Sequence, residues 1–415
     1  MPTRRAVVLS SVAAAALAAV PSRAVAGTPR ASGGAGLVRF GLPKPSGPYP
    51  VGTVPLHLVD GSRPDPWVST QPFRELMVSV RYPARDVGGH PYAPHMLPGE
   101  AAGWVELNSL YKVPAERVDW AATRTHAHEY APVAAHGGPY PVVLYSPGAG
   151  DPRSLGTTLC DDLASRGYVV VTVDHTYDAS AVEFPGNRVE KSVLLAEFLK
   201  VQDDQKKIGE LLHKTEDIRV ADTRFVLDAL PRALPGRLRA AADLRRIGMF
   251  GQSAGGFTAL QTMHDDPRIA AAANFDCVVS YVQNDSDPGN LSSVAVDGLD
   301  RPFLLVGKDG NTRGTVPSWD ALLSHSHGWY RGLTLTGAEH VSFTDLEVIV
   351  PQLAGPLGLD RETVVANIGD IPPAEAVPAD RAYLAAFFDR WLRGRDDDGL
   401  LDGPSARYPR MTFFA

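Results

Sequence analysis

The sequence predicts a doubly wound α/β fold, in which a mostly parallel sheet has helices on both faces. Continuous apolar runs recur from residue 141 onward, as expected of strands that are covered on both faces. Segments with apolar residues at helical spacing lie between these runs, and buried strands that alternate with helices form a doubly wound sheet. The 415 residues are 44% apolar and 21% charged, which is an ordinary globular composition.

The first 26 residues have the features of a secretory signal. Arg4 and Arg5 form a positive start, residues 6–20 are an apolar run rich in Ala and Val, and residues 24–26 offer small side chains to a signal peptidase. The apolar run is too short to be a membrane span. We therefore expect residues 1–26 to be a signal peptide of a secreted protein, and the arginine pair leaves the twin-arginine route open.

The next part of the chain predicts a short lead-in and two strands. Residues 27–46 are expected to form a disordered lead-in to a single domain over residues 47–415. Alternating apolar and polar residues in Val51–Val59 and Arg74–Tyr82 predict half-buried strands. Residues 83–139 contain Pro, Gly and His throughout and are expected to be irregular.

From residue 141 onward the chain alternates between predicted buried strands and helices. The expected strands are Pro141–Tyr145, Tyr168–Val173, Arg246–Phe250, Ile269–Phe275, Pro302–Val306 and Leu333–Leu335. The expected helices are Arg153–Arg166, Glu216–Leu230 and Asp380–Arg393, with Asp380 as the N-cap of the last one. The polar and charged residues 178–214 interrupt this alternation, and they predict either a cap over the site or a solvated excursion.

Charge and composition exclude several classes of partner. The net charge is −7 and there is no basic stripe, so nucleic acid is not an expected partner. No second apolar segment is long enough for an integral membrane span. No cluster has the spacing of zinc ligands, and no cofactor is implied. The two cysteines, Cys160 and Cys277, fit either one disulfide or two free thiols.

Ser253 is the predicted nucleophile. It lies in Gly251-Gln-Ser-Ala-Gly255, between a predicted strand and a predicted helix. A serine on a sharp strand-to-helix turn is held out toward a substrate, and the close backbone approach requires Gly two positions before and after it. This context is typical of the α/β-hydrolase fold, whereas the motif alone would also fit a Gly-rich turn with a passive serine.

His340 is the predicted general base, because the chain order in this fold is serine, acid, histidine. Four histidines follow Ser253. His264 lies on the helix behind the nucleophile and should point away, and His325 and His327 lie in a polar stretch. His340 follows the last predicted strand and its exit loop, from which a base can reach the serine.

The residues leave the acid open between two aspartates. Asp276 follows the predicted strand that ends at Phe275, and Asp309 follows the strand that ends at Val306. Both lie at carboxyl ends of strands, where chemistry is found in open α/β sheets, and both precede His340. The acid has to hold the imidazole tautomer and stabilise its charged form, and either residue fits that role.

Two backbone N–H groups are expected to form an oxyanion hole. One should come from Ala254, directly after the nucleophile. The other should come from Ala149, in the loop of small residues at 146–150 that follows an earlier strand. A plain turn is the alternative interpretation of this loop.

These motifs together resemble the platelet-activating-factor acetylhydrolase family, the plasma and type II group of serine esterases. The similarity covers roughly residues 47–355, and its motifs occur in the family's order. They are Gly47–Gly52, Ser146–Gly150, Asp161–Tyr168, Val173–His175, Gly251–Gly256 and Glu339–Asp345.

The resemblance implies that Asp276 is the acid, because the family's aspartate lies about two dozen residues after the serine. In bacterial cutinases and polyester hydrolases, a related group, the acid stands at the place of Asn311, and Asp309 matches an aspartate that is not catalytic there. Pro147 replaces a family His and Ala254 replaces a family Phe, so the resemblance does not set the acyl length.

The activity implied is that of a secreted bacterial esterase or lipase on a small-molecule or lipid ester, with contact to a lipid surface as one expectation. A cutinase-like polyester hydrolase and a peptidase are the alternatives within catalysis. A non-enzymatic binding protein with the same fold is the third hypothesis, and it is disfavoured because Ser253, His340 and an acid are all present.

Overall fold

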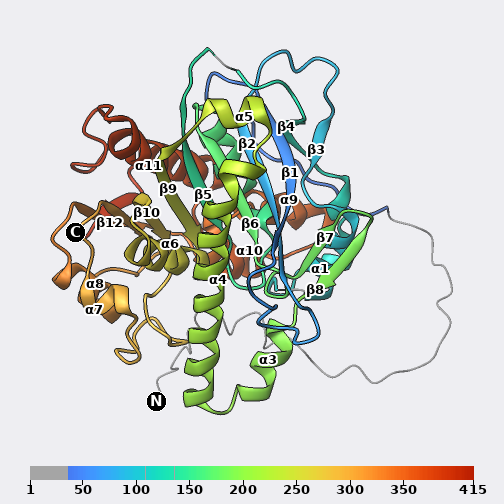
Figure 1. Cartoon of the computed structure of the whole chain (residues 1–415). Coiled ribbons are helices and arrows are strands. Elements are labelled where there is room, and N and C mark those ends of the chain that lie inside the picture. The colour runs from blue at the N-terminus through green and yellow to red at the C-terminus, as the bar shows by residue number, and fades with distance from the viewer. Residues whose placement is uncertain (1–35, 108, 135) are drawn as a thin grey trace, which may run out of the picture.

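The computed structural model describes residues 36–107, 109–134 and 136–415 (Figure 1). The predicted signal peptide and residues 27–35 lie outside the described residues. The main sheet has 11 strands in the order β13-β12-β11-β10-β9-β5-β6-β2-β1-β4-β3. These strands are β1 (Val51–Asp60), β2 (Arg74–Pro83), β3 (Tyr92–Pro94), β4 (Arg124–Glu129), β5 (Tyr140–Ser146), β6 (Val169–Asp174), β9 (Ala242–Gln252), β10 (Ile269–Phe275), β11 (Phe303–Gly307), β12 (Tyr330–Leu335) and β13 (Met411–Phe413).

The middle of the sheet is parallel, as predicted. The strands from β6 through β5, β9, β10 and β11 to β12 all pair in parallel, whereas β2 joins β6 and β1 antiparallel. The carboxyl ends of β5, β9, β10 and β12 therefore meet along one edge, where ligands bind in doubly wound sheets.

Helices cover both faces of this sheet (Figure 1). Val142 and Leu144 of β5 pack in a core with α4 and α6, and the alternate residues Val143 and Tyr145 pack in a second core with α2 and α11. The longer helices are α1 (Pro98–Leu107), α2 (Thr157–Ser165), α4 (Gln205–Ala233), α6 (Ala254–Asp265), α8 (Pro317–His325), α9 (Leu346–Leu357), α10 (Arg361–Ile368) and α11 (Pro373–Arg393). The predicted α/β-hydrolase architecture is confirmed.

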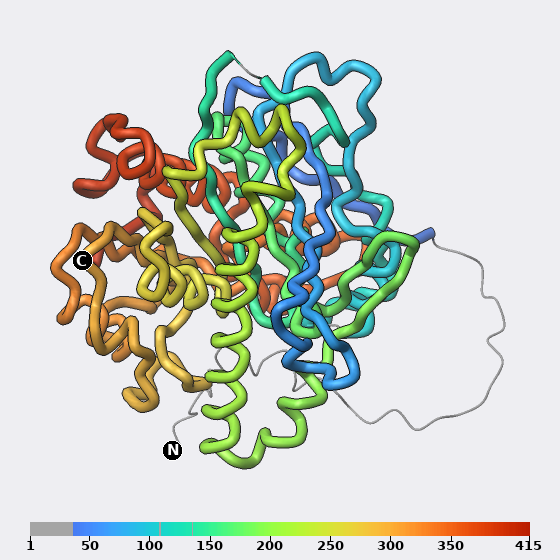
Figure 2. The backbone as a smooth tube through the Cα atoms, in the orientation of Figure 1, coloured from blue at the N-terminus to red at the C-terminus, as the bar shows by residue number. Residues whose placement is uncertain are grey.

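Residues 178–214 leave the layered core. They form the hairpin of β7 (Ala181–Phe184) and β8 (Arg188–Lys191), then α3 (Leu194–Val201) and the first turns of α4. Figures 1 and 2 show α3 and the first half of α4 extending beyond the edge of the main sheet.

Three local predictions are wrong. The lead-in is ordered from Val38, which pairs with residues 117 and 119, and Phe40 is buried in a core with α9. Residues 83–139 contain α1, β3 and β4. Asp380 is not an N-cap, because α11 begins at Pro373, where the fixed φ of proline suits the first helical position.

Two further features concern exclusions made from the sequence. Within the described ranges, no helix is long and apolar enough to cross a membrane. Cys160 and Cys277 are both free thiols, so the disulfide that the sequence left open is not formed.

Candidate active site

Ser253 occupies the turn between β9 and α6. Its φ angle is 54°, a left-handed conformation that is rare for a residue with a side chain and that clusters at functional sites. Its N–H donates to the carbonyl of Phe275 at 2.9 Å. A Cβ atom on Gly255 would lie 1.8 Å from the carbonyl oxygen of Ser146, so only glycine lets α6 approach β5 this closely.

His340 and Asp276 lie in direct contact. The Nδ1 atom of His340 is 2.6 Å from Oδ2 of Asp276, and Asp276 follows β10 with a φ angle of 56°. The second carboxylate oxygen accepts from the Lys308 N–H and from Nδ2 of Asn311, both at 2.8 Å. Asp309, the alternative acid, is exposed. The structure thus brings Asp276, and not Asp309, to His340.

Asp276 is held in its ionised form. Burial alone would raise its pKa, but the hydrogen bonds from His340 and the Lys308 N–H, with the charges of these two residues, outweigh burial and hold its pKa below the ordinary value. An ionised Asp276 accepts a hydrogen bond from the Nδ1–H group of His340, so Nε2 of His340 carries the free lone pair that a general base needs.

Gln252 places that base at the nucleophile turn. Its Nε2 atom donates to His340 Nε2 and to the His340 carbonyl oxygen, each at 3.1 Å. Its Oε1 atom is buried and has no partner among the described residues. Sequence reasoning assigned no role to Gln252, although its position directly before Ser253 was a signal.

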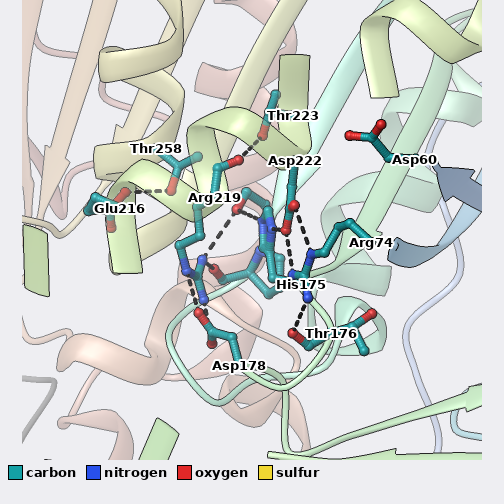
Figure 3. A network of polar contacts seen from close by, with 12 residues as sticks. Asp60, Arg74, His175, Thr176, Asp178, Glu216, Arg219, Asp222, Thr223 and Thr258 are labelled. Atoms are coloured by element: carbon teal, nitrogen blue, oxygen red, sulfur yellow. Dashed lines mark hydrogen bonds and ion pairs between the residues drawn. The ribbon is translucent and has the colours of Figure 1, made fainter. Parts of the chain in front are cut away.

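The loop that follows β5 is held by Arg219 of α4. Arg219 donates to the carbonyl oxygens of Pro147 at 2.8 Å and of Gly148 at 3.0 Å. Asp178 binds Arg219 through two contacts, at 2.7 and 2.8 Å, and accepts the N–H of Gly150 at 2.9 Å (Figure 3).

This arrangement sets the direction of one predicted oxyanion donor. In a trans peptide the C=O and N–H groups point to opposite sides. The Gly148 carbonyl points at Arg219, so the N–H of Ala149 in the same peptide points away from Arg219. A Cβ atom on Gly148 would lie 3.3 Å from the Cβ of Ser253, which places this peptide beside Ser253. Ala254 is the first residue of α6, where the N–H has no partner within the helix.

A second serine, histidine and aspartate lie behind the loop. Oγ of Ser146 is 3.0 Å from Nε2 of His175, and Nδ1 of His175 is 3.0 Å from Oδ2 of Asp222, which also binds Arg74 (Figure 3). These three residues are 0–1% exposed. Burial lowers the pKa of His175, so it is neutral. No substrate reaches this group, and it serves as a buried support for the loop.

Asp151 adds an ionisable group next to the loop. Its N–H donates to the Gly148 carbonyl at 3.1 Å. Burial raises its pKa to about 7, although the charges of His340 and Arg219 act in the opposite direction. Asp151 therefore carries less negative charge near the predicted oxyanion hole at neutral pH than an ordinary carboxylate would.

An apolar cavity adjoins both predicted oxyanion donors. Ala149 and Ala254 line it, together with Phe257 of α6. Residues of the 178–214 excursion form much of its wall, so the cap interpretation fits their position better than a solvated excursion does. The other lining residues are Leu107, Gly150, Ser192, Leu194, Leu195, Phe198, Leu211, Leu212, Thr215, Glu216, Cys277, Val278, Ser280 and Val282.

The other histidines that follow Ser253 lie elsewhere, as predicted. His264 contacts Asp265 and Asp297 at the surface, and Nδ1 of His325 donates to the Ala295 carbonyl. Among the described residues, no group of three or more His, Cys, Asp or Glu side chains is arranged to hold a metal ion.

Comparisons with known proteins identify the family. The family model of platelet-activating factor acetylhydrolase, isoform II, matches residues 36–193. A probable 1-alkyl-2-acetylglycerophosphocholine esterase of Arthroderma benhamiae is 31% identical, and the match covers 90% of this chain and 94% of that protein. The chain belongs to the platelet-activating-factor acetylhydrolase family. The resemblance predicted from its motifs is confirmed.

Other members and a solved structure agree with this assignment. Platelet-activating factor acetylhydrolase of Gallus gallus is 22% identical over 64% of this chain and 66% of its own. The structure of a ferulic acid esterase from Streptomyces cinnamoneus matches with a TM-score of 0.72 and 37% identity, over 90% of this chain and 99% of that one. The protein is therefore a carboxylic ester hydrolase of the α/β-hydrolase type, and the hypothesis of a non-enzymatic binding protein is wrong.

Proposed function

We propose that this acetylhydrolase-family esterase acts through a catalytic triad of Ser253, His340 and Asp276. The hydrogen bond between His340 and Asp276 is the observation that carries the proposal. It fixes the tautomer in which Nε2 of His340 is the base, and Gln252 holds that atom at the turn of Ser253.

The reaction begins when Nε2 of His340 takes the Oγ proton of Ser253 and Oγ bonds to the ester carbonyl carbon. Gln252 occupies Nε2 in the described state, so this contact is exchanged for the Ser253 hydroxyl before the proton moves. His340 then gives the proton to the departing alcohol, which leaves an acyl group on Ser253. Water, deprotonated by His340, releases the acid.

Negative charge that develops on the carbonyl oxygen is stabilised by the N–H groups of Ala149 and Ala254. Arg219 supports this role, because it holds the peptide of Ala149 in one orientation before substrate binds. Such preorganised donors stabilise the transition state more than the ground state.

The substrate is a small-molecule or lipid ester whose acyl group enters the apolar cavity. Residues 178–214 form a cap, and its residues Leu194, Phe198 and Leu211 line this cavity. This lining favours a small ester over a polyester chain, which needs an open cleft. Export through the predicted signal in residues 1–26 makes the enzyme secreted, and contact with a lipid surface brings lipid esters to the cap.

Reaction with a fluorophosphonate tests the nucleophile. The probe should modify one residue of the mature protein, and peptide mass spectrometry should place it on Ser253. Ser253→Ala should abolish labelling and hydrolysis of p-nitrophenyl esters of every chain length. Labelling that persists in Ser253→Ala would show that another residue is the nucleophile.

A further inference from the structure

The apolar cavity contains a buried carboxyl group. Glu216 of α4 lines the cavity and is 5% exposed, while most neighbouring lining residues are Leu, Val, Phe and Ala. Burial of a carboxyl in apolar surroundings is unfavourable unless the group is neutral or hydrogen-bonded. The position of the Glu216 carboxyl in this apolar cavity therefore indicates a role in binding.

Glu216 has one hydrogen-bond partner among the described side chains. Oε2 lies 2.8 Å from Oγ1 of Thr258 (Figure 3). The same Oγ1 lies 2.8 Å from the carbonyl oxygen of Ala254. The Thr258 hydroxyl has one hydrogen, and a carbonyl oxygen can only accept. When that hydrogen serves Ala254, a protonated Glu216 donates to Thr258. Burial raises the pKa of Glu216 to about 8, although Arg219 and Thr258 lower it, so the neutral acid prevails at neutral pH.

Ser280 supplies a second polar group to the same cavity. Ser280 is 3% exposed, and its Oγ atom is buried with no partner among the described residues. Buried hydroxyl groups are normally hydrogen-bonded, so an unpartnered one in a cavity wall indicates a ligand that completes the bond. Glu216 and Ser280 thus give an otherwise apolar cavity two groups that can bind a polar atom.

We propose that Glu216 and Ser280 bind a hydroxyl group on the acyl part of the ester, which makes the cavity selective for hydroxylated acyl groups. The inference rests on the proposed function. The acyl group is the part that stays on Ser253 after the alcohol has left, and the cavity adjoins both predicted oxyanion donors, so the acyl group is the part that the cavity can hold. Phe198 and Phe257 pack against the hydrocarbon of the acyl group, and Glu216 and Ser280 form hydrogen bonds with its hydroxyl. A site built to bind a hydroxyl discriminates strongly against an analogue that lacks it.

A series of rigid esters tests this selectivity. We would measure kcat/KM for methyl cinnamate and for its ortho, meta and para hydroxy derivatives. At least one hydroxylated ester should exceed the parent by roughly ten- to hundredfold, and Glu216→Leu should bring this ratio close to one. Ser280→Ala should reduce the ratio in part. In Ser192→Ala the ratio should not change, because the Ser192 hydroxyl already has partners within the protein: it lies within hydrogen-bond distance of the Tyr177 and Asp178 carbonyls and accepts the Leu194 N–H.

The ratio within each variant is the readout, since it cancels effects on the common catalytic steps. A wild-type enzyme that cleaves the parent and every derivative at the same rate would overturn the inference, and so would a ratio that Glu216→Leu leaves intact. If Glu216→Leu does not fold, the wild-type series and Ser280→Ala still decide. Hydrolysis that persists in Ser253→Ala would instead overturn the proposed function.

Discussion

Arg219 orients the predicted oxyanion hole, and removing it should slow catalysis without weakening substrate binding. The guanidinium joins α4 to the carbonyls of Pro147 and Gly148. Without these bonds the peptide of Ala149 is held less firmly, although the Asp151 N–H still donates to the Gly148 carbonyl. Because the N–H of Ala149 is proposed to bind charge that exists only in the transition state, the loss should appear in kcat rather than in KM.

The magnitude follows from what the substitution leaves behind. Losing one oxyanion donor outright lowers kcat by about 10²–10³. In Arg219→Met the donor is still present but loosely held, so we expect a fall of roughly ten- to a hundredfold. The single variant also leaves Asp178 buried and unpaired, which costs about 3–5 kcal/mol of unfolding free energy. The double variant Arg219→Met with Asp178→Asn removes both charges and keeps an acceptor for the Gly150 N–H.

Steady-state kinetics with a p-nitrophenyl ester would measure both constants, and thermal unfolding would show that each variant is folded. Arg224→Met is the matched control, because Arg224 lies on the same helix but makes a weaker ion pair. Its side chain is 54% exposed, and its Nε atom is 3.6 Å from Oδ2 of Asp266. It should change the unfolding free energy by less than about 1 kcal/mol and leave kcat unchanged. A folded Arg219→Met/Asp178→Asn double variant with kcat within twofold of wild type would show that Arg219 does not orient the oxyanion hole.

Two further predictions concern stability. Gly255→Ala should prevent correct folding or inactivate the enzyme, because its Cβ would lie 1.8 Å from the Ser146 carbonyl oxygen, whereas Gly236→Ala, with nothing within 4 Å, should fold normally in a thermal unfolding assay. Glu216→Gln should gain stability relative to wild type as pH rises from 4.5 to about 8, by about 1.4 kcal/mol for each pH unit, because the raised pKa of Glu216 gives the wild type stability that is full below the ordinary pKa of 4.5 and is lost over this range. Urea unfolding at several pH values would measure this difference, and a pH-independent difference would contradict it.

Local patterns in the sequence predicted the parts of the site that local chemistry dictates. The strand, the Gly-flanked Ser253 and the following helix are contiguous, so the turn could be placed from its own residues. The choice of Asp276 over Asp309 needed the family resemblance. Its physical basis lies in the left-handed backbone of Asp276 and in its bonds to Lys308 and Asn311, which join β10 to the next strand.

The contacts that support the site were beyond sequence reasoning because they join distant segments. Arg219 lies about 70 residues from the loop that it holds, and nothing in its own helix marks it as different from Arg224. The start of α11 was misplaced because of local residues rather than distant contacts. The predicted start at Asp380 lies after both Pro373 and Pro378, whereas α11 begins at Pro373, the first helical position that proline favours, and contains Pro378 in its interior.

The kcat values of Asp276→Asn and Asp309→Asn test the proposed triad, because only one aspartate can orient His340. We expect Asp276→Asn to lower kcat by roughly 10³–10⁴-fold, since Asn favours the wrong imidazole tautomer, and Asp309→Asn, at an exposed position, to stay close to wild type. Near-normal turnover in Asp276→Asn together with an inactive Asp309→Asn would contradict the proposed triad.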